Sequence, residues 1–427
     1  MEKYRHVNKD KKSFGFVVVI LSLLVLATVA NIFITPDFSK SFILIYALLF
    51  VLLLIFSRHT PVRLSGIFRS LVGLLFIFSS FVKGVDPIGF SYKIHDYLSA
   101  YNMTWLNSLS LILAIAAITV EFVVGIAMLL DIKPKFFTVI ASLLMIFFTI
   151  LTLMDALYNK VPDCGCFGDA VIMTNWQTFY KNLTIDLALL IVWFSFNKIK
   201  PLFYNNAEIG ITITFTVLFL AMEIYCLLFL PIVDFRDWKV GKKMTLDNPL
   251  PIEYYAEYRN DTTGMTKIYK VEEIPYYDST WMEHWQFVRQ SNIDKNEYPH
   301  NVRLFDETST DVTNSILSNP DYHVMIVSYS IENMKMKNFD KLKALIDYCV
   351  SHNYSLEFVT SSEIDTYNEF VNQNELHDLT FCNADDIELK AMIRSNPGIV
   401  AMKNGVVIKK WSRFNIPNEM KLDKYLQ

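Results

Sequence analysis

Long apolar runs alternate with short polar segments through the first half of the chain. A helix needs about 20 apolar residues to cross a bilayer whose hydrocarbon core is roughly 30 Å thick. Such runs predict seven spans, of which the second, third and sixth are short: Phe14–Phe33, Ser41–Phe56, Ile67–Val82, Trp105–Leu130, Phe136–Leu157, Leu183–Phe196 and Ile209–Ile232. We therefore expect an α-helical polytopic membrane protein.

The pattern changes after Pro231, where apolar runs become short and polar residues intervene. Ile252–Tyr258 and Met265–Val271 are typical of two strands of a hairpin. From Val302 onward strands and helices alternate, and the segments are Val324–Tyr329, Phe339–Val350, Leu356–Val359, Ile399–Met402 and Val406–Trp411. The tail is therefore expected to be a soluble α/β region.

These patterns divide the chain into five parts. They are an N-terminal transmembrane hairpin (1–64), a four-helix membrane bundle (65–200), a seventh transmembrane helix (201–232), a β-rich linker region (233–301) and a C-terminal α/β domain (302–427).

Lys and Arg indicate which loops face the cytoplasm, because cytoplasmic loops carry an excess of these residues. They cluster in the N-terminus (Lys3 to Lys12), after the second span (Arg58, Arg63), after the fourth (Lys133, Lys135) and after the sixth (Lys198, Lys200). These segments alternate as a cytoplasmic N-terminus requires, and seven spans then place the tail outside. A cleaved signal peptide is the alternative for the first span, since a basic start, an apolar run and the string Thr28-Val29-Ala30 are typical of one.

Composition agrees with two unlike halves. Of 427 residues, 52% are hydrophobic, yet the chain after Pro231 contains 22 Lys and Arg against 30 Asp and Glu. An acidic tail does not favour nucleic acid as a partner. The five cysteines do not form a disulfide scaffold, because only Cys164 and Cys166 lie close in sequence.

The segment Asp163-Cys164-Gly165-Cys166-Phe167-Gly168 lies in the loop between the fifth and sixth predicted spans. The expected orientation puts this loop outside, where disulfides persist. A bridge between Cys164 and Cys166 closes a very small ring, and strained, exposed bridges are easily reduced. Redox exchange, a structural disulfide and soft-metal capture all remain open, although no histidine lies nearby to complete a metal site.

This loop and the helices before it resemble the DoxX/MauE-like membrane family over about Arg69 to Trp193. The matching residues are Arg69, Gly73, Phe76, Ser79, Lys83, Asp86, Pro87, Phe90, Glu121, Gly125 and the string from Asp163 to Gly168. The resemblance implies a four-helix bundle formed by the third to sixth spans. It also implies a role in thiol-linked or quinone-linked oxidoreductase assemblies, or in the maturation of a disulfide-rich client protein. No feature specific to methylamine metabolism is visible.

Charged side chains inside the bundle are further candidates, since an ionised group in a membrane is costly unless it is paired. Glu121 lies in the middle of the fourth span, and Arg69 would be its partner if depth permits. Lys83 and Asp86 lie at the outer end of the third span, on the side of the cysteine loop. Glu121 is either a polar clamp between helices or a proton relay beside a quinone.

The C-terminal domain resembles a thioredoxin-like fold over about Val302–Ile416. Asn396-Pro397 falls where that fold places its cis-proline, so Pro397 is a candidate for binding a partner polypeptide. The active-site turn should follow Val324–Tyr329, but Ser330–Met334 contains no cysteine, and thioredoxin chemistry needs a thiolate there. Cys349 lies on the core face of a helix; Cys382 ends a strand and is either buried or exposed.

Two hypotheses of function follow. The chain is a membrane thiol–disulfide oxidoreductase that acts through Cys164 and Cys166, or a non-catalytic assembly factor whose outer domain binds a partner. Both expect the cytoplasmic (inner) membrane of a bacterium, an outer (periplasmic) C-terminal domain and an extracytoplasmic client protein. The first adds a membrane quinone as its cofactor.

Overall fold

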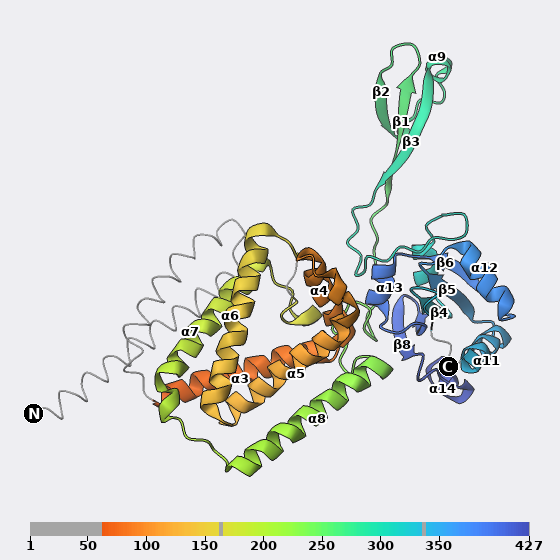
Figure 1. Cartoon of the computed structure of the whole chain (residues 1–427). Coiled ribbons are helices and arrows are strands. Elements are labelled where there is room, and N and C mark those ends of the chain that lie inside the picture. The colour runs from red at the N-terminus through yellow and green to blue at the C-terminus, as the bar shows by residue number, and fades with distance from the viewer. Residues whose placement is uncertain (1–61, 162–164, 335–338, 427) are drawn as a thin grey trace, which may run out of the picture. The chain divides into compact units, whose positions relative to one another are not determined.

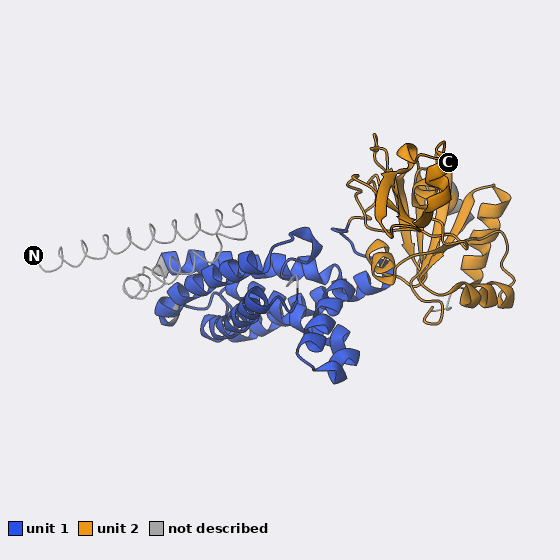
Figure 2. Cartoon of the chain, turned by 90° about the horizontal axis from the view of Figure 1, so that it is seen from above, with its two compact units in different colours: residues 1–236 blue, residues 237–427 orange. Residues whose placement is uncertain are grey.

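The structure is a computed structural model that describes residues 62–161, 165–334 and 339–426. The chain forms two compact units, Met1–Arg236 and Asp237–Gln427 (Figure 2). The first two predicted spans and Cys164 lie outside the described residues.

The first unit is a bundle of long helices (Figure 1). They are α3 (Val62–Gly84), α4 (Pro87–Ala100), α5 (Ser110–Leu129), α6 (Pro134–Tyr158), α7 (Asn175–Ser195) and α8 (Asn205–Phe229). Short 3₁₀ turns join them: η3 (Thr104–Leu109), η4 (Gly168–Ala170) and η5 (Phe196–Lys198).

Four helices among the described residues are long and apolar enough to cross a membrane: Leu64–Gly84, Thr104–Leu129, Pro134–Tyr158 and Asn205–Phe229. They confirm the third, fourth, fifth and seventh predicted spans as apolar helices. The sixth predicted span lies in α7, which contains Lys181 and Asp186 and is not among the four. The helix α4 was not predicted at all.

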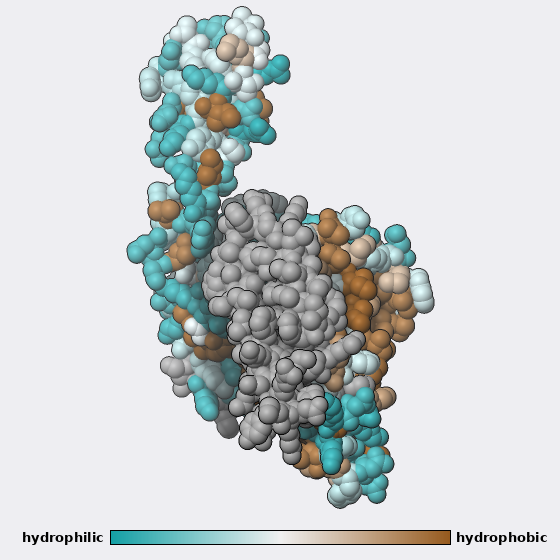
Figure 3. Space-filling model, turned by 90° about the vertical axis from the view of Figure 1, so that its left-hand side faces the viewer, coloured by the Kyte–Doolittle hydropathy of each residue, from teal (hydrophilic) through white to brown (hydrophobic). Residues whose placement is uncertain are grey.

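Close packing joins α3 to α5 and α6 to α7, around a shared core that includes Val72, Phe76, Met128, Ala141 and Leu189. Apolar side chains also crowd the visible outer surface of the bundle (Figure 3), with Phe147 59% and Leu143 63% exposed. An apolar exterior of this kind suits helices surrounded by lipid.

Helix α8 makes two contacts with α5 and one with the N-cap of α6. The rings of Phe219 and Phe122 stack with centroids 3.9 Å apart. Thr119 Oγ1 donates a hydrogen bond to Oε2 of the fully buried Glu223 at 2.9 Å. The backbone N–H of Lys133 donates to Glu208 Oε1 at 3.1 Å.

The second unit contains two sheets. β1 (Glu253–Asn260) pairs antiparallel with β2 (Thr266–Lys270) and with β3 (Trp285–Ile293), and β3 was not predicted. An aromatic cluster of Tyr258, Tyr269, Trp281 and Trp285 covers one side of this three-stranded sheet. The helix α9 (Ser279–His284) and the 3₁₀ turn η6 (Val271–Glu273) lie between β2 and β3 in the chain.

The other sheet has the strand order β6-β5-β4-β7-β8. β4 (Tyr322–Ser328), β5 (Ser355–Thr360) and β6 (Thr380–Asn383) are parallel to one another. β7 (Gly398–Lys403) pairs antiparallel with β4 on one side and with β8 (Val406–Ser412) on the other. Its helices are α10 (Thr313–Leu317), α11 (Phe339–Ser351), α12 (Ile364–Gln373), α13 (Asp386–Met392) and α14 (Glu419–Leu426). The predicted strands and helix of this domain are confirmed.

Side chains alternate across this sheet, as in any strand. Val324 and Ile326 of β4 join a core with Leu342 and Leu345 of α11. Met325 and its cross-strand partner Glu357 therefore point to the opposite side of the sheet, where Glu357 is 3% exposed. The bond Asn396–Pro397, just before β7, is cis.

Candidate functional site

The crossing of α3 and α5 is built on two glycines. A Cβ placed on Gly73 would lie 2.8 Å from the carbonyl oxygen of Gly125, and one on Gly125 would lie 2.9 Å from that of Gly73. Backbones in membranes approach closely through small residues of this kind. The close approach brings the polar side chains of the two helices within reach of each other.

Lys83 of α3 and Glu121 of α5 form a buried ion pair. Their residues are only 5% and 7% exposed, and the Lys83 ammonium lies 5.1 Å from the ring centroid of Phe90. Arg69 pairs with Asp131 instead of Glu121. Two candidate residues from the sequence are therefore brought together, and Arg69 is not the partner of Glu121.

The described part of the cysteine loop lies against the bundle. Ser79 Oγ of α3 donates a hydrogen bond to the carbonyl oxygen of Cys166 at 2.7 Å. Gly165 has a φ of +64°, a backbone conformation that L side chains rarely adopt. A Cβ at this position would contact the methylenes of Lys93. The Lys181 ammonium lies 4.6 Å from the ring centroid of Phe167. These contacts fix Cys166, which is half-buried, beside α3, α4 and α7.

A cavity of about 620 Å³ lies inside the bundle. Cys166, Lys83 and Glu121 all line it, together with Tyr97 and Lys93 of α4 and many apolar side chains. Cavities of about 300 to 1,000 Å³ are typical of small-molecule sites. The cysteine and the buried ion pair that the sequence singled out separately thus share one cavity wall.

Asp86 has a different place from Lys83 and Glu121. Its carboxylate caps the N-terminus of α4 by accepting the N–H of Gly89 at 3.0 Å, and it is not among the residues that line the cavity. Burial by itself lowers the pKa of the Arg236 guanidinium, but the negative charges of Asp86, Asp234 and Asp169 raise it. The pKa of Arg236 therefore lies above its ordinary value. Asp86 therefore belongs to a charged group with Asp169, Asp234 and Arg236.

Sequence reasoning missed a second polar pair at the cavity. The Tyr97 hydroxyl donates to Asp155 Oδ2 at 2.6 Å, and Asp155 is fully buried. The sequence does contain a signal for α4, since Asp86 followed by Pro87 is typical of a helix N-cap and first turn.

In the second unit, Asn396 connects the region of Pro397 with the end of β4. Ser328 Oγ donates to Asn396 Oδ1 at 2.7 Å, and Asn396 Nδ2 donates to the carbonyl oxygen of Ser330 at 2.7 Å. Pro397 thus lies next to the turn that contains no cysteine. Cys349 and Cys382 are fully buried, and burial raises the pKa of each thiol to about 12, so both are unreactive near neutral pH.

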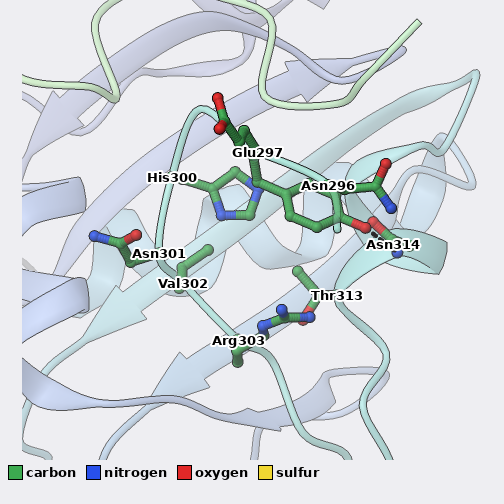
Figure 4. A pocket seen from close by; sticks show the side chains of 9 residues that line it. Asn296, Glu297, His300, Asn301, Val302, Arg303, Thr313 and Asn314 are labelled. Atoms are coloured by element: carbon green, nitrogen blue, oxygen red, sulfur yellow. Dashed lines mark hydrogen bonds between the residues drawn. The ribbon is translucent and has the colours of Figure 1, made fainter. Parts of the chain in front are cut away.

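A second cavity, of about 390 Å³, lies in the loops before α10 (Figure 4). Asn296, His300, Arg303 and Asn314 are among its lining residues. Arg303 already pairs with Asp311, at 3.2 Å. This cavity brings together no redox group or nucleophile that the sequence pointed to. Within the described ranges, no group of three or more His, Cys, Asp or Glu side chains is placed to hold a metal ion.

Apolar helices of spanning length and a cysteine loop held against them define a helical membrane protein with an internal cavity. Residues 61–195, about a third of the chain, match the family model described as methylamine utilisation protein MauE. This part of the chain, from α3 to the end of α7, is similar to that family. No curated protein and no solved structure matches the chain significantly.

Proposed function

We propose that Cys164 and Cys166 exchange a disulfide with thiols of an extracytoplasmic client protein, and that the bundle passes the electrons to or from a membrane quinone. The observation that carries this proposal is the position of Cys166, held by Ser79 at the wall of the cavity. Lys93 and Lys181 line the same cavity, and positive charges favour a reactive thiolate.

The outer unit supplies client recognition in this proposal. The strand order β6-β5-β4-β7-β8 and the position of Pro397 support a thioredoxin-like fold. Ser330–Met334 stands in place of the usual active-site cysteines, so the unit binds a polypeptide near Pro397 without exchanging electrons. The seven-span arrangement in an inner membrane, with this unit on the periplasmic side, belongs to the same proposal.

The reduction potential of the Cys164–Cys166 pair tests the exchange. The one-residue spacing makes the ring strained and favours the dithiol. Thiol labelling across a glutathione or dithiothreitol series should give a midpoint above about −230 mV, whereas structural bridges lie below about −300 mV. A midpoint near the lower limit, or thiols that never oxidise, would contradict exchange.

Trapping then identifies the client. A Cys164→Ser or Cys166→Ser variant leaves one thiol unable to resolve a mixed disulfide, so client adducts should accumulate in cells. Cys382→Ser, at a fully buried thiol, is the matched control and should trap nothing. The absence of adducts from both single variants would count against the proposal.

A non-catalytic assembly factor is the second candidate, and the missing cysteine in Ser330–Met334 favours it. Its outer unit would bind a client while Cys164 and Cys166 only shape a turn. A Cys164→Ser/Cys166→Ser double variant with full function in cells would support this candidate over exchange. The methylamine pathway named in the family description is not carried over to this chain.

A further inference from the structure

The cavity in the bundle has two kinds of wall. Apolar side chains of α3, α4, α5 and α6 make most of it, including Phe76, Phe90 and Phe148. Phe147 and Ile150 of α6 also line it and are each 59% exposed on the outer surface of the bundle. These two side chains therefore belong both to the cavity wall and to the exposed apolar surface of α6.

Several polar side chains interrupt the apolar wall, and two of them, Lys83 and Tyr97, each belong to a polar pair. One is the pair of Lys83 with Glu121, in which the Lys83 ammonium is a hydrogen-bond donor only. The other is Tyr97 with Asp155; the Tyr97 hydroxyl donates a hydrogen bond to Asp155 Oδ2, so toward a ligand the phenol oxygen acts as an acceptor. The cavity thus offers a cationic donor and an acceptor beside Cys166.

These properties fit a quinone better than an acyl chain. A carbonyl oxygen of a quinone needs a donor, a hydroxyl of the quinol needs an acceptor, and the ring and tail need apolar and aromatic walls. Closing the Cys164–Cys166 disulfide releases two electrons and two protons, and reduction of a quinone to a quinol takes up the same number. An acyl chain has no group that would bind the donor or the acceptor.

We propose that this cavity binds the head of a membrane quinone and that Tyr97, held by Asp155, is a residue that recognises it. This inference rests on the proposed function and adds residues outside the cysteine loop. Asp155 is a positioning residue: it keeps the Tyr97 hydroxyl oriented by accepting its hydrogen bond at Oδ2. Lys83, held by Glu121, supplies the donor to a carbonyl oxygen.

Binding of decylubiquinone to the full chain in phospholipid nanodiscs tests the proposal without any turnover. Wild-type nanodiscs should retain more decylubiquinone than empty ones. Tyr97→Phe, Asp155→Asn and Lys83→Met should each weaken binding, by about five- to tenfold for the loss of one hydrogen bond in an apolar site. Tyr92→Phe, on the same helix but not in the lining, and Asp186→Asn should bind as wild type.

A second pair of variants keeps the test sound if the polar variants fail to fold. Ala117 lines the cavity and Ala116 does not, although both are exposed residues of α5. Ala117→Phe should abolish decylubiquinone binding, and Ala116→Phe should leave it intact. Equal binding by both variants would overturn the proposal, as would retention of decane as strong as that of decylubiquinone, which would mark an acyl-chain site.

The Cys164→Ser/Cys166→Ser double variant separates this proposal from the proposed function. It should still bind decylubiquinone, because the recognising groups are Tyr97 and Lys83. Quinone binding without client exchange would reject only the proposed function. Client exchange without quinone binding would reject the site in the cavity and the quinone as electron carrier, but not the exchange by Cys164 and Cys166.

Discussion

Replacing Glu357 with Gln should change how the stability of the outer unit depends on pH. Glu357 is 3% exposed; Ser355 Oγ donates to its Oε1 at 2.5 Å, and its Oε2 has no hydrogen-bond partner among the described residues. Burial raises the pKa of this carboxyl from its usual 4.5 to about 7. The folded state therefore holds the proton more tightly than the unfolded state does.

The magnitude follows from that difference in pKa. Because the folded pKa is raised, the stabilisation is fully present below pH 4.5 and is lost as the pH rises through 7, by about 3 kcal/mol in total. Burial lowers the pKa of His323 from 6.5 to about 4, so its contribution is present above pH 6.5 and is lost as the pH falls through 4. Between pH 4.5 and 6.5, therefore, the Glu357 carboxyl lowers the stability of the outer unit as the pH rises, whereas the His323 imidazole raises it.

Urea unfolding of residues 237–427, followed by tryptophan fluorescence from pH 4 to 8, measures the effect. The stability of Glu357→Gln relative to wild type should rise by about 3 kcal/mol between pH 4.5 and pH 8. Cys349 and Cys382, the thiols near Glu357, stay protonated in this range. Glu369→Gln, at an exposed position, is the control and should follow wild type. Parallel curves for Glu357→Gln and wild type would refute the reasoning.

Three further predictions concern the membrane domain and the tail. Protease added to intact spheroplasts should digest Ile232–Gln427, and full protection would overturn the topology. The isolated tail should not reduce insulin, because Ser330–Met334 contains no cysteine; clear turnover would contradict a binding role. Gly73→Val should destabilise the bundle by about 1–3 kcal/mol through its clash with Gly125, measured as a lower thermal midpoint in detergent. Gly66→Val, with no atom within 4 Å of the added Cβ, should not.

The long apolar helices could be predicted because a membrane span needs a continuous apolar run, and α3, α5, α6 and α8 each have one. Helix α4 has no such run: it is 14 residues long and mixes polar with apolar side chains. Strand β3 was missed for a related reason. Nearly all of its side chains are exposed, so it lacks the alternation of apolar and polar residues that marks a half-buried strand.

The partners of buried charges could be predicted only in part. Lys83 and Glu121 were recognised as candidates because charges inside a membrane are costly. Their pairing, and that of Arg69 with Asp131, depends on the depth at which each helix lies, which a hydrophobic run does not specify. Tyr97 and Asp155 are 58 residues apart, and only the packing of α4 beside α6 brings them together.

The attachment of α8 has a mechanical consequence. Lipid is as apolar as a helix surface, so little hydrophobic force holds one helix against another in a membrane, and polar contacts and close packing must do so. The bond from Lys133 to Glu208 lies near the start of α8, and that from Thr119 to Glu223 lies four turns later. A helix held at two depths resists both sliding and rotation. Tension on the chain that follows α8 is therefore shared between α5, the helix that carries Glu121, and the start of α6.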